Sequence, residues 1–208
     1  MNIKSLLKEI HSWDEFQNRL LTLPKKQKGD AFELLTKIYF KTEPIYKFYD
    51  EVWMLSEVPQ KDLEYLGLES QDLGIDLIAK SGNEYHAIQC KYHSDKNQSV
   101  TFKELSTFTT LLNKNSKLTQ GYLCTSAIST SKNFDKVDKG NVIKIMSDTW
   151  EQLDAEFFKK AHKFLEGKRI KIDPYKPRKH QKNALKEAVN HFKTNDEERG
   201  KLIFPCGS

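Results

Sequence analysis

Two apolar runs separated by a short turn, residues 75–79 and 85–92, constrain the fold more than any other feature. Runs rich in β-branched and aromatic residues form strands, and the Ser-Gly-Asn segment at residues 81–83 is typical of a turn. The sequence therefore predicts a β-hairpin. Counting outward from the centre of the turn pairs Asp76 with Gln89 on the neighbouring strand.

A candidate metal site follows from this hairpin. Side chains alternate along a strand, so Gln89 and Lys91 project from one face while Cys90 points to the other. Asp76, opposite Gln89, shares their face. Mg²⁺ prefers oxygen ligands and is usually held by one or two carboxylates together with the substrate phosphate. We expect the Asp76 carboxylate, the Gln89 amide oxygen and the Cys90 backbone carbonyl to bind the ion. Lys91 would steady the charge on phosphorus and orient or deprotonate the attacking water.

The same residues have a simpler interpretation, which the spacing leaves open. Asp76 and Lys91 would then form a cross-strand ion pair worth about 0.2–1 kcal/mol, with Gln89 as a solvated neighbour. Such a pair would have no role in chemistry.

Three segments of the chain carry motifs that belong together. One is Asp76 followed by Gln89-Cys90-Lys91, an Asp…(Glu/Gln)-x-Lys pattern. The others are Gly-Asp-Ala-Phe-Glu at residues 29–33 and Gly-Tyr-Leu-Cys-Thr-Ser-Ala-Ile-Ser at residues 121–129. In this order they resemble the Mrr-like branch of the PD-(D/E)XK nucleases, in which the two outer segments begin the first core helix and form a strand with a Thr-Ser turn. The glycine-rich approach to the aspartate is thinner here than in that branch.

This resemblance covers residues 26–150 and implies a Mg²⁺-dependent DNA endonuclease that leaves 5′-phosphate and 3′-hydroxyl ends. It implies catalytic roles for Asp76, Gln89 and Lys91. It also implies that Glu33 faces the site and holds a water at the metal. Glu33 has an alternative role, because an acidic residue in the first turns of a helix interacts favourably with the helix dipole.

The net charge of +5 is concentrated in one part of the sequence. Residues 166–208 contain eleven Lys or Arg and six Asp or Glu, whereas residues 1–165 contain 23 of each sign. Eight basic residues and one acidic residue lie between residues 168 and 186, which indicates either a contact with a phosphate backbone or a solvated linker. Elsewhere we expect DNA contacts from lysines on either side of the site: Lys25, Lys26, Lys28, Lys96 and Lys103.

A second set of motifs lies at residues 174–208. Arg178-Lys179-His180-Gln181 precedes an apolar run at residues 202–204 and Pro-Cys-Gly-Ser at residues 205–208. This order resembles the opening of a superfamily 2 helicase or translocase, which implies that Gln181 binds the adenine of ATP. A working phosphate-binding loop also needs a Gly-Lys-Ser/Thr sequence. We therefore expect ATP to act only in a longer protein, and no ATPase activity from this fragment. A chance match is the alternative.

Taken together, the nuclease-like and the translocase-like segments resemble the N-terminal end of type ISP restriction-modification enzymes. They imply double-stranded DNA as the substrate and cleavage controlled by ATP-driven motion. They also imply translocase and methyltransferase parts in the same longer polypeptide, and a second copy where both strands are cut. Two other functions stay open: a non-catalytic DNA-binding or docking module of a translocase, and an ATPase fragment with a structural N-terminal cap.

Strands that alternate with helices, together with one antiparallel hairpin, predict an α/β fold with a mixed central sheet and helices on both faces. The resemblance makes this sheet restriction-endonuclease-like. We expect a nuclease domain at residues 1–165 with a helical extension at residues 1–25, and a basic linker with a truncated ATPase start at residues 166–208. The site should lie at a sheet edge or at a fork where the hairpin opens. Other helices are predicted at residues 13–23, 29–40, 61–68, 102–112 and 150–165, and a helical turn at residues 132–136. Other strands are predicted at residues 118–124 and 142–146, and a strand or an extended segment at residues 46–55.

Cysteine spacing and hydropathy indicate the cellular compartment in which we expect the protein. The three cysteines, Cys90, Cys124 and Cys206, form no C-x-x-C pair, which favours a reduced protein over a secreted or zinc-bound one. No run approaches the roughly 20 apolar residues of a membrane span, and residues 1–4 do not begin a signal peptide. We expect a cytoplasmic protein without membrane contact.

Overall fold

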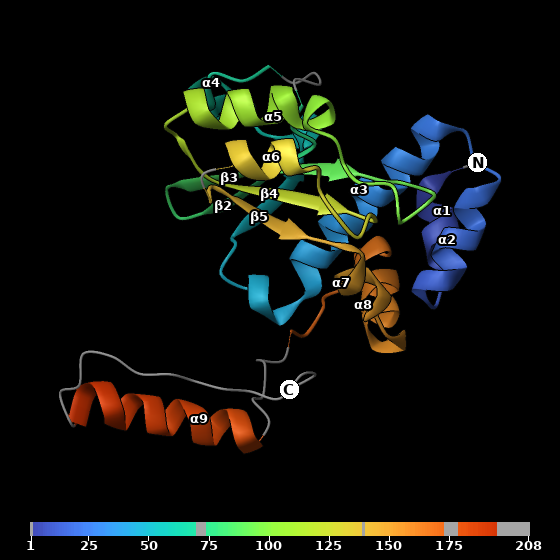
Figure 1. Ribbon diagram of the computed structural model, residues 1–208. Helices are drawn as coiled ribbons and strands as arrows, with labels where there is room; N and C mark the ends of the chain where they lie inside the picture. The colour runs from blue at the N-terminus through green and yellow to red at the C-terminus, as the bar shows by residue number, and fades with distance from the viewer. Residues whose placement is uncertain (1, 70–73, 139, 173–178, 195–208) are drawn as a thin grey trace. The chain divides into compact units, whose positions relative to one another are not determined.

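The computed structural model describes residues 2–69, 74–138, 140–172 and 179–194 (Figure 1). The chain divides into one compact unit, Met1–Ile172, and a second, Asp173–Ser208. In the second unit the described part is helix α9 (Lys179–Val189), followed by a π-helical turn. The predicted strand at residues 202–204 and loop at residues 205–208 lie outside the described residues. None of the described helices is both long and apolar enough to span a bilayer.

The first unit is built on a five-stranded sheet in the order β1-β2-β3-β4-β5. Neighbouring strands among β1, β2 and β3 are antiparallel, whereas β3, β4 and β5 are parallel, so the predicted mixed sheet is confirmed. The strands are β1 (Glu51–Met54), β2 (Leu77–Ser81), β3 (Glu84–Lys91), β4 (Leu118–Thr125) and β5 (Val142–Ile145). The helices are α1 (Ile3–Lys8), α2 (Trp13–Leu21), α3 (Lys25–Thr42), α4 (Gln60–Leu66), α5 (Phe102–Lys114), α6 (Lys132–Val137), α7 (Ser147–Glu151) and α8 (Ala155–Leu165).

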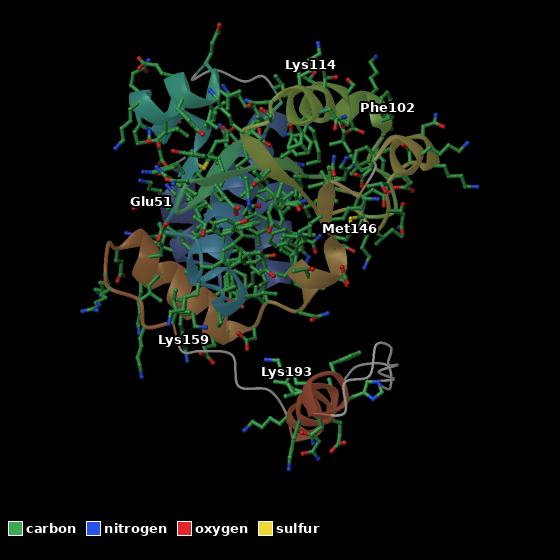
Figure 2. All side chains as sticks on the ribbon, turned by 90° about the vertical axis from the view of Figure 1, so that its left-hand side faces the viewer. Glu51, Phe102, Lys114, Met146, Lys159 and Lys193 are labelled. Carbon is green, nitrogen blue, oxygen red and sulfur yellow. The ribbon has the colours of Figure 1, made fainter. Side chains whose placement is uncertain are left out.

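Helices cover both faces of this sheet, as predicted (Figure 1). On one face α4, α5 and α6 pack on inward side chains such as Ile78 and Leu123. On the other face α1, α2, α3, α7 and α8 pack on Leu77, Ile88 and Cys90. Phe102 and Lys114 mark the two ends of α5 in Figure 2. Each strand of the hairpin therefore buries both of its faces, which explains why it is apolar along nearly its whole length.

The predicted hairpin is present with the predicted register. Leu77 pairs with Ile88, which places Asp76 opposite Gln89 one step further along. Only residues 82 and 83 lie between the two strands. Gly82 takes a φ of 57°, which a residue without a β-carbon adopts at no steric cost.

Three predicted elements differ from the structure by more than two residues at an end. Helix α3 begins at Lys25 rather than at residue 29, because Pro24 occupies its N-cap with a φ of −58° and leads directly into the first turn. The single helix predicted at residues 150–165 is wrong. The Asp154 side chain accepts a hydrogen bond from Phe157 N at 2.9 Å, which starts α8 as a helix separate from α7. Within the segment predicted at residues 46–55, strand β1 spans Glu51–Met54.

The N-terminal helices belong to the core of the first unit. Trp13 of α2 stacks on Trp150 of α7 with ring centroids 6.2 Å apart, and Phe32 of α3 lies 5.0 Å from Trp150. Phe32 also packs 5.7 Å from Tyr92, directly after β3. All but Tyr92 are at least nine-tenths buried. The aromatic cluster fixes α3 against the end of β3, where the candidate site residues lie.

Replacing Phe32 with alanine should lower the free energy of unfolding of the first unit by about 3–5 kcal/mol, because it empties the space between these rings. Urea denaturation followed by circular dichroism measures the change. Leu21→Ala is the matched control: Leu21 is 62% exposed, and its truncation should change stability by less than about 0.5 kcal/mol. Equal effects of the two substitutions would contradict this description of the core.

Candidate functional site

The start of β2 and the end of β3 bring three polar groups together. Asp76 Oδ2 accepts hydrogen bonds from the Cys90 backbone N–H at 2.5 Å and from Gln89 Nε2. Gln89 Nε2 also lies 3.2 Å from the Cys90 carbonyl oxygen. These are the three groups that the sequence predicts as metal ligands. They lie at the ends of the two middle strands β2 and β3, and not along an outer strand of the sheet.

The backbone of Asp76 is fixed on both sides. Its N–H donates to Ile88 O at 2.9 Å, and its carbonyl accepts from Leu55 N at 2.8 Å. The carboxylate is therefore held by the strand ladder, and its direction follows from the hairpin register.

Gln89 provides the test of whether this site fits a cation. Its side chain is 2% exposed, and its Oε1 has no hydrogen-bond partner among the described residues. A buried amide oxygen without a partner is costly. The two ends of an amide have nearly the same shape, so the group can turn over and present Oε1 beside Asp76 Oδ2 and the Cys90 carbonyl. Three oxygens facing one point need a positive charge between them, and this donor set suits Mg²⁺.

Softer metals are not favoured by the described residues. In the part of the chain that the structure describes, no group of three or more His, Cys, Asp or Glu side chains is arranged to hold a metal. The two buried thiols, Cys90 and Cys124, are free and point to the face opposite Gln89. A structural zinc site is therefore not formed by these residues.

Lys91 lies two residues after Gln89 and on the same face of β3. Its side chain is half-buried, and its ammonium group makes no hydrogen bond or ion pair with the described residues. The Asp76–Lys91 ion pair, the simpler interpretation of the sequence, is absent among these residues. The Lys91 charge still acts nearby. Burial opposes ionisation of Glu104, but hydrogen bonds from Thr101 and the charges of His93 and Lys91 hold the pKa of this carboxyl below its usual range.

The Thr-Ser turn after β4 fixes the backbone around Lys91. Thr125 Oγ1 donates to the Lys91 carbonyl at 2.7 Å, and Ser126 N donates to the same oxygen at 3.3 Å. Ser126 Oγ accepts from His93 N at 2.7 Å and donates to His93 O at 2.9 Å. Trp150 Nε1 in turn donates to Thr125 O at 2.8 Å. The sequence identified this turn as a motif, and in the structure its hydrogen bonds hold the end of β3.

Glu33 is half-buried on α3, directly after Phe32. Its charge reaches the end of β3. Burial and a hydrogen bond with Cys124 raise the pKa of the Cys90 thiol, and the negative charges of Asp76 and Glu33 raise it further. The two carboxylates therefore act on the same buried group. Gln181, predicted to bind adenine, belongs to α9, but its side chain lies outside the described residues.

A cavity beside Lys91 was not predicted from the sequence. It has a volume of about 420 Å³ and is lined by the first turn of α3, the residues that follow β3, and α5. His93 Nε2 lies 3.2 Å from Glu104 Oε1 in its wall. The available signal was the Thr101-x-x-Glu104 capping box, which predicts where α5 begins but not what it packs against.

Comparison with known proteins agrees with this architecture. A family model described as a restriction endonuclease, Mrr_cat_2, matches residues 41–169, a range that includes Asp76, Gln89 and Lys91 but not Glu33. The ATP-dependent type ISP restriction-modification enzyme LlaBIII, solved bound to DNA, is 27% identical with a TM-score of 0.54, over 94% of this chain and 12% of that chain. The DNA modification-dependent restriction endonuclease AspBHI is 17% identical with a TM-score of 0.41, over 79% of this chain and 39% of that chain. A search of curated proteins gives no match.

Replacing Ser126 with alanine should lower the free energy of unfolding by about 1–3 kcal/mol, because the buried backbone groups of His93 lose their partner. Hydrogen exchange of the His93 amide should quicken more than that of amides in the middle of β4. Ser116→Ala, at an exposed position, is the control and should change neither quantity. Unchanged exchange at His93 in the Ser126 variant would show that the turn does not hold this segment.

Proposed function

The chain belongs to the Mrr_cat_2 family of restriction endonucleases, and from this premise we propose that it hydrolyses DNA phosphodiester bonds with Mg²⁺ at the end of the β2–β3 hairpin. The observation that carries the proposal is the convergence of the Asp76 carboxylate, the Cys90 carbonyl and the buried Gln89 amide on one point. The type ISP enzyme LlaBIII, to which the chain is similar in fold and sequence, supports DNA as the substrate.

The ligands of the ion would be Asp76 Oδ2, the Cys90 carbonyl oxygen and Gln89 Oε1 after the amide turns over. When bound, Mg²⁺ lowers the pKa of a water molecule and neutralises charge on the phosphate. Asp76 is the one full negative charge of this set, so it contributes most of the electrostatic attraction. Gln89 and Cys90 add neutral oxygens. Two neutral ligands leave the site weakly charged, so the phosphate of DNA can approach.

Lys91 has a different task in the proposed reaction. Its ammonium group is not neutralised by the described residues, and it lies on the same face as Gln89. It can donate a hydrogen bond to the oxygens on which charge develops during attack at phosphorus, and it can orient the attacking water. Glu33 would accept a hydrogen bond from a second water and so fix its position. The cut would leave 5′-phosphate and 3′-hydroxyl ends.

The larger setting is part of the same proposal. The chain corresponds to 12% of the LlaBIII chain, which is described as ATP-dependent. We infer that this nuclease works within a longer cytoplasmic polypeptide with translocase and methyltransferase parts, in which Gln181 binds the adenine of ATP. Double-stranded DNA would be the substrate, and a second copy would supply the cut in the other strand. Residues 1–165 would form the nuclease domain, and residues 166–208 would form a basic linker and the start of the ATPase domain.

Asp76→Asn and Lys91→Ala should each slow Mg²⁺-dependent nicking of plasmid DNA by about 100- to 1,000-fold, because each removes a charge that acts on the transition state. Asp14→Asn, an exposed carboxylate of α2, is the control and should cut at the parent rate. Chelation with EDTA should stop cleavage by the parent. Normal cutting by a well-folded Asp76→Asn protein would refute the assignment.

Metal binding separates the roles of the two residues and tests the rival docking-module function. Isothermal titration with Mn²⁺ should show binding to the parent and to Lys91→Ala, and none to Asp76→Asn. A docking module that has lost activity predicts no cleavage and no Mn²⁺ binding that depends on Asp76. Thermal melting of each variant provides the folding control.

A further inference from the structure

The cavity beside Lys91 begins where β3 ends. Tyr92 and His93, the two residues that follow Lys91, line it together with Ser94, Asp95 and Gln98. Lys25 and Lys28 from the first turns of α3, and Glu104 from α5, complete the wall. Two parts of the chain that lie far apart in the sequence, the start of α3 and the segment from the end of β3 to α5, therefore meet next to the proposed catalytic lysine.

The carboxylates of this cavity are already engaged. Glu104 Oε2 accepts from Thr101 N at 2.8 Å and from Thr101 Oγ1 at 2.7 Å, and Glu104 Oε1 faces His93. Asp95 Oδ1 accepts from Asn97 N at 3.0 Å and from Asn97 Nδ2 at 3.2 Å. Both carboxylates keep their negative charge, but these hydrogen bonds hold them in local turns, and neither forms an ion pair with Lys25 or Lys28.

The two lysines keep their charge available. Lys28 Nζ contacts a neutral group, Ser94 Oγ, at 3.3 Å. Lys25 makes no ion pair with the described residues. The two lie three residues apart and so on one side of α3, whereas Lys26 projects elsewhere and does not line the cavity. The first turn of α3 contains no acidic residue, and its cap provides no side-chain hydrogen bond. The formal charges of the lining balance, two lysines against Asp95 and Glu104, but the lysines on α3 form no ion pair with either carboxylate among the described residues.

We propose that this cavity binds a phosphate of the DNA strand being cut, next to the phosphate at Lys91. The inference rests on the proposed nuclease function and adds to it the path of the substrate strand. Lys25 and Lys28 contact this neighbouring phosphate from α3, while Ser94 and Gln98 offer hydrogen bonds from the segment after β3. Contacts of this kind position a duplex without reading its bases. They would place the cut at a fixed distance along the backbone in any sequence.

The test measures DNA binding without cleavage, on the whole chain in EDTA, with a fluorescent duplex over a range of salt concentrations. The Lys25→Ala/Lys28→Ala double variant should bind more weakly. Its plot of log affinity against log salt should be shallower by about one unit for each phosphate that the two lysines neutralise in the parent. Lys159→Ala is the control, because it removes an exposed lysine of α8 that does not line the cavity and forms no ion pair with the described residues, and its slope should equal that of the parent. Equal slopes for the double variant and the control would overturn the proposal.

Methylphosphonate substitution identifies the phosphate. On duplexes that carry one neutral linkage, Mg²⁺-dependent cleavage by the parent should drop at the bond next to that linkage, and the double variant should show no such drop. A penalty that is identical in both proteins at every position would also overturn the proposal. If the double variant melts early, Lys25→Ala and Lys28→Ala measured singly give the same comparison.

The outcomes for the two proposals are distinguishable. Normal cleavage by Asp76→Asn would refute the nuclease site but leave the salt slopes unaffected. Loss of cleavage in Asp76→Asn, together with unchanged slopes in the lysine variants, would uphold the nuclease site and refute the phosphate-binding cavity.

Discussion

The antiparallel register of β2 and β3 is the constraint on which the candidate site depends. A slip by one residue would turn Asp76 toward the face that carries Leu77 and Cys90, and the carboxylate would be buried in the apolar core. Backbone bonds to Ile88 and Leu55 prevent this slip on both sides of Asp76. The Asp76 carboxylate also accepts a hydrogen bond from Cys90 N. The side chain proposed to bind the metal therefore also stabilises the strand pair that positions it.

A second set of contacts joins the site to the rest of the fold. Thr125 and Ser126 hold the backbone on either side of Tyr92, and Trp150 holds Thr125. Trp150 also packs against Phe32, which places α3 and its Glu33 beside the same strand end. Because these links pass through buried side chains, α3, β3 and β4 form one rigid support. Catalysis needs such a support, since small displacements of reacting groups reduce rates steeply.

Two polar groups at this strand end have no partner among the described residues. Gln89 Oε1 is buried without a hydrogen bond to the described residues, and Lys91 has no counter-ion among them. By contrast, the buried Asp62 carboxylate accepts hydrogen bonds from Lys80 at 2.8 Å and from Tyr85. Away from the strand end, Thr36 Oγ1 of α3 is also buried without a partner among the described residues. Unmatched groups cost stability, and proteins keep them chiefly where a ligand completes them. The contrast within one sheet supports a binding role for the end of β3.

Local patterns in the sequence determined the hairpin, its register and the shared face of Asp76, Gln89 and Lys91, because strand alternation and a two-residue turn act over a few residues. The predicted start of the helix at residue 13 is confirmed for the same reason, because Ser12 Oγ caps α2 by accepting a hydrogen bond from Glu15 N. Only the tertiary structure decided that Thr125 lies beside Lys91, that Asp154 interrupts the helix predicted at residues 150–165, and that α3 carries two lysines to the cavity. These contacts join segments separated by tens of residues. They depend on how side chains such as Phe32 and Trp150 pack, and packing of that kind has no periodic signature in the sequence.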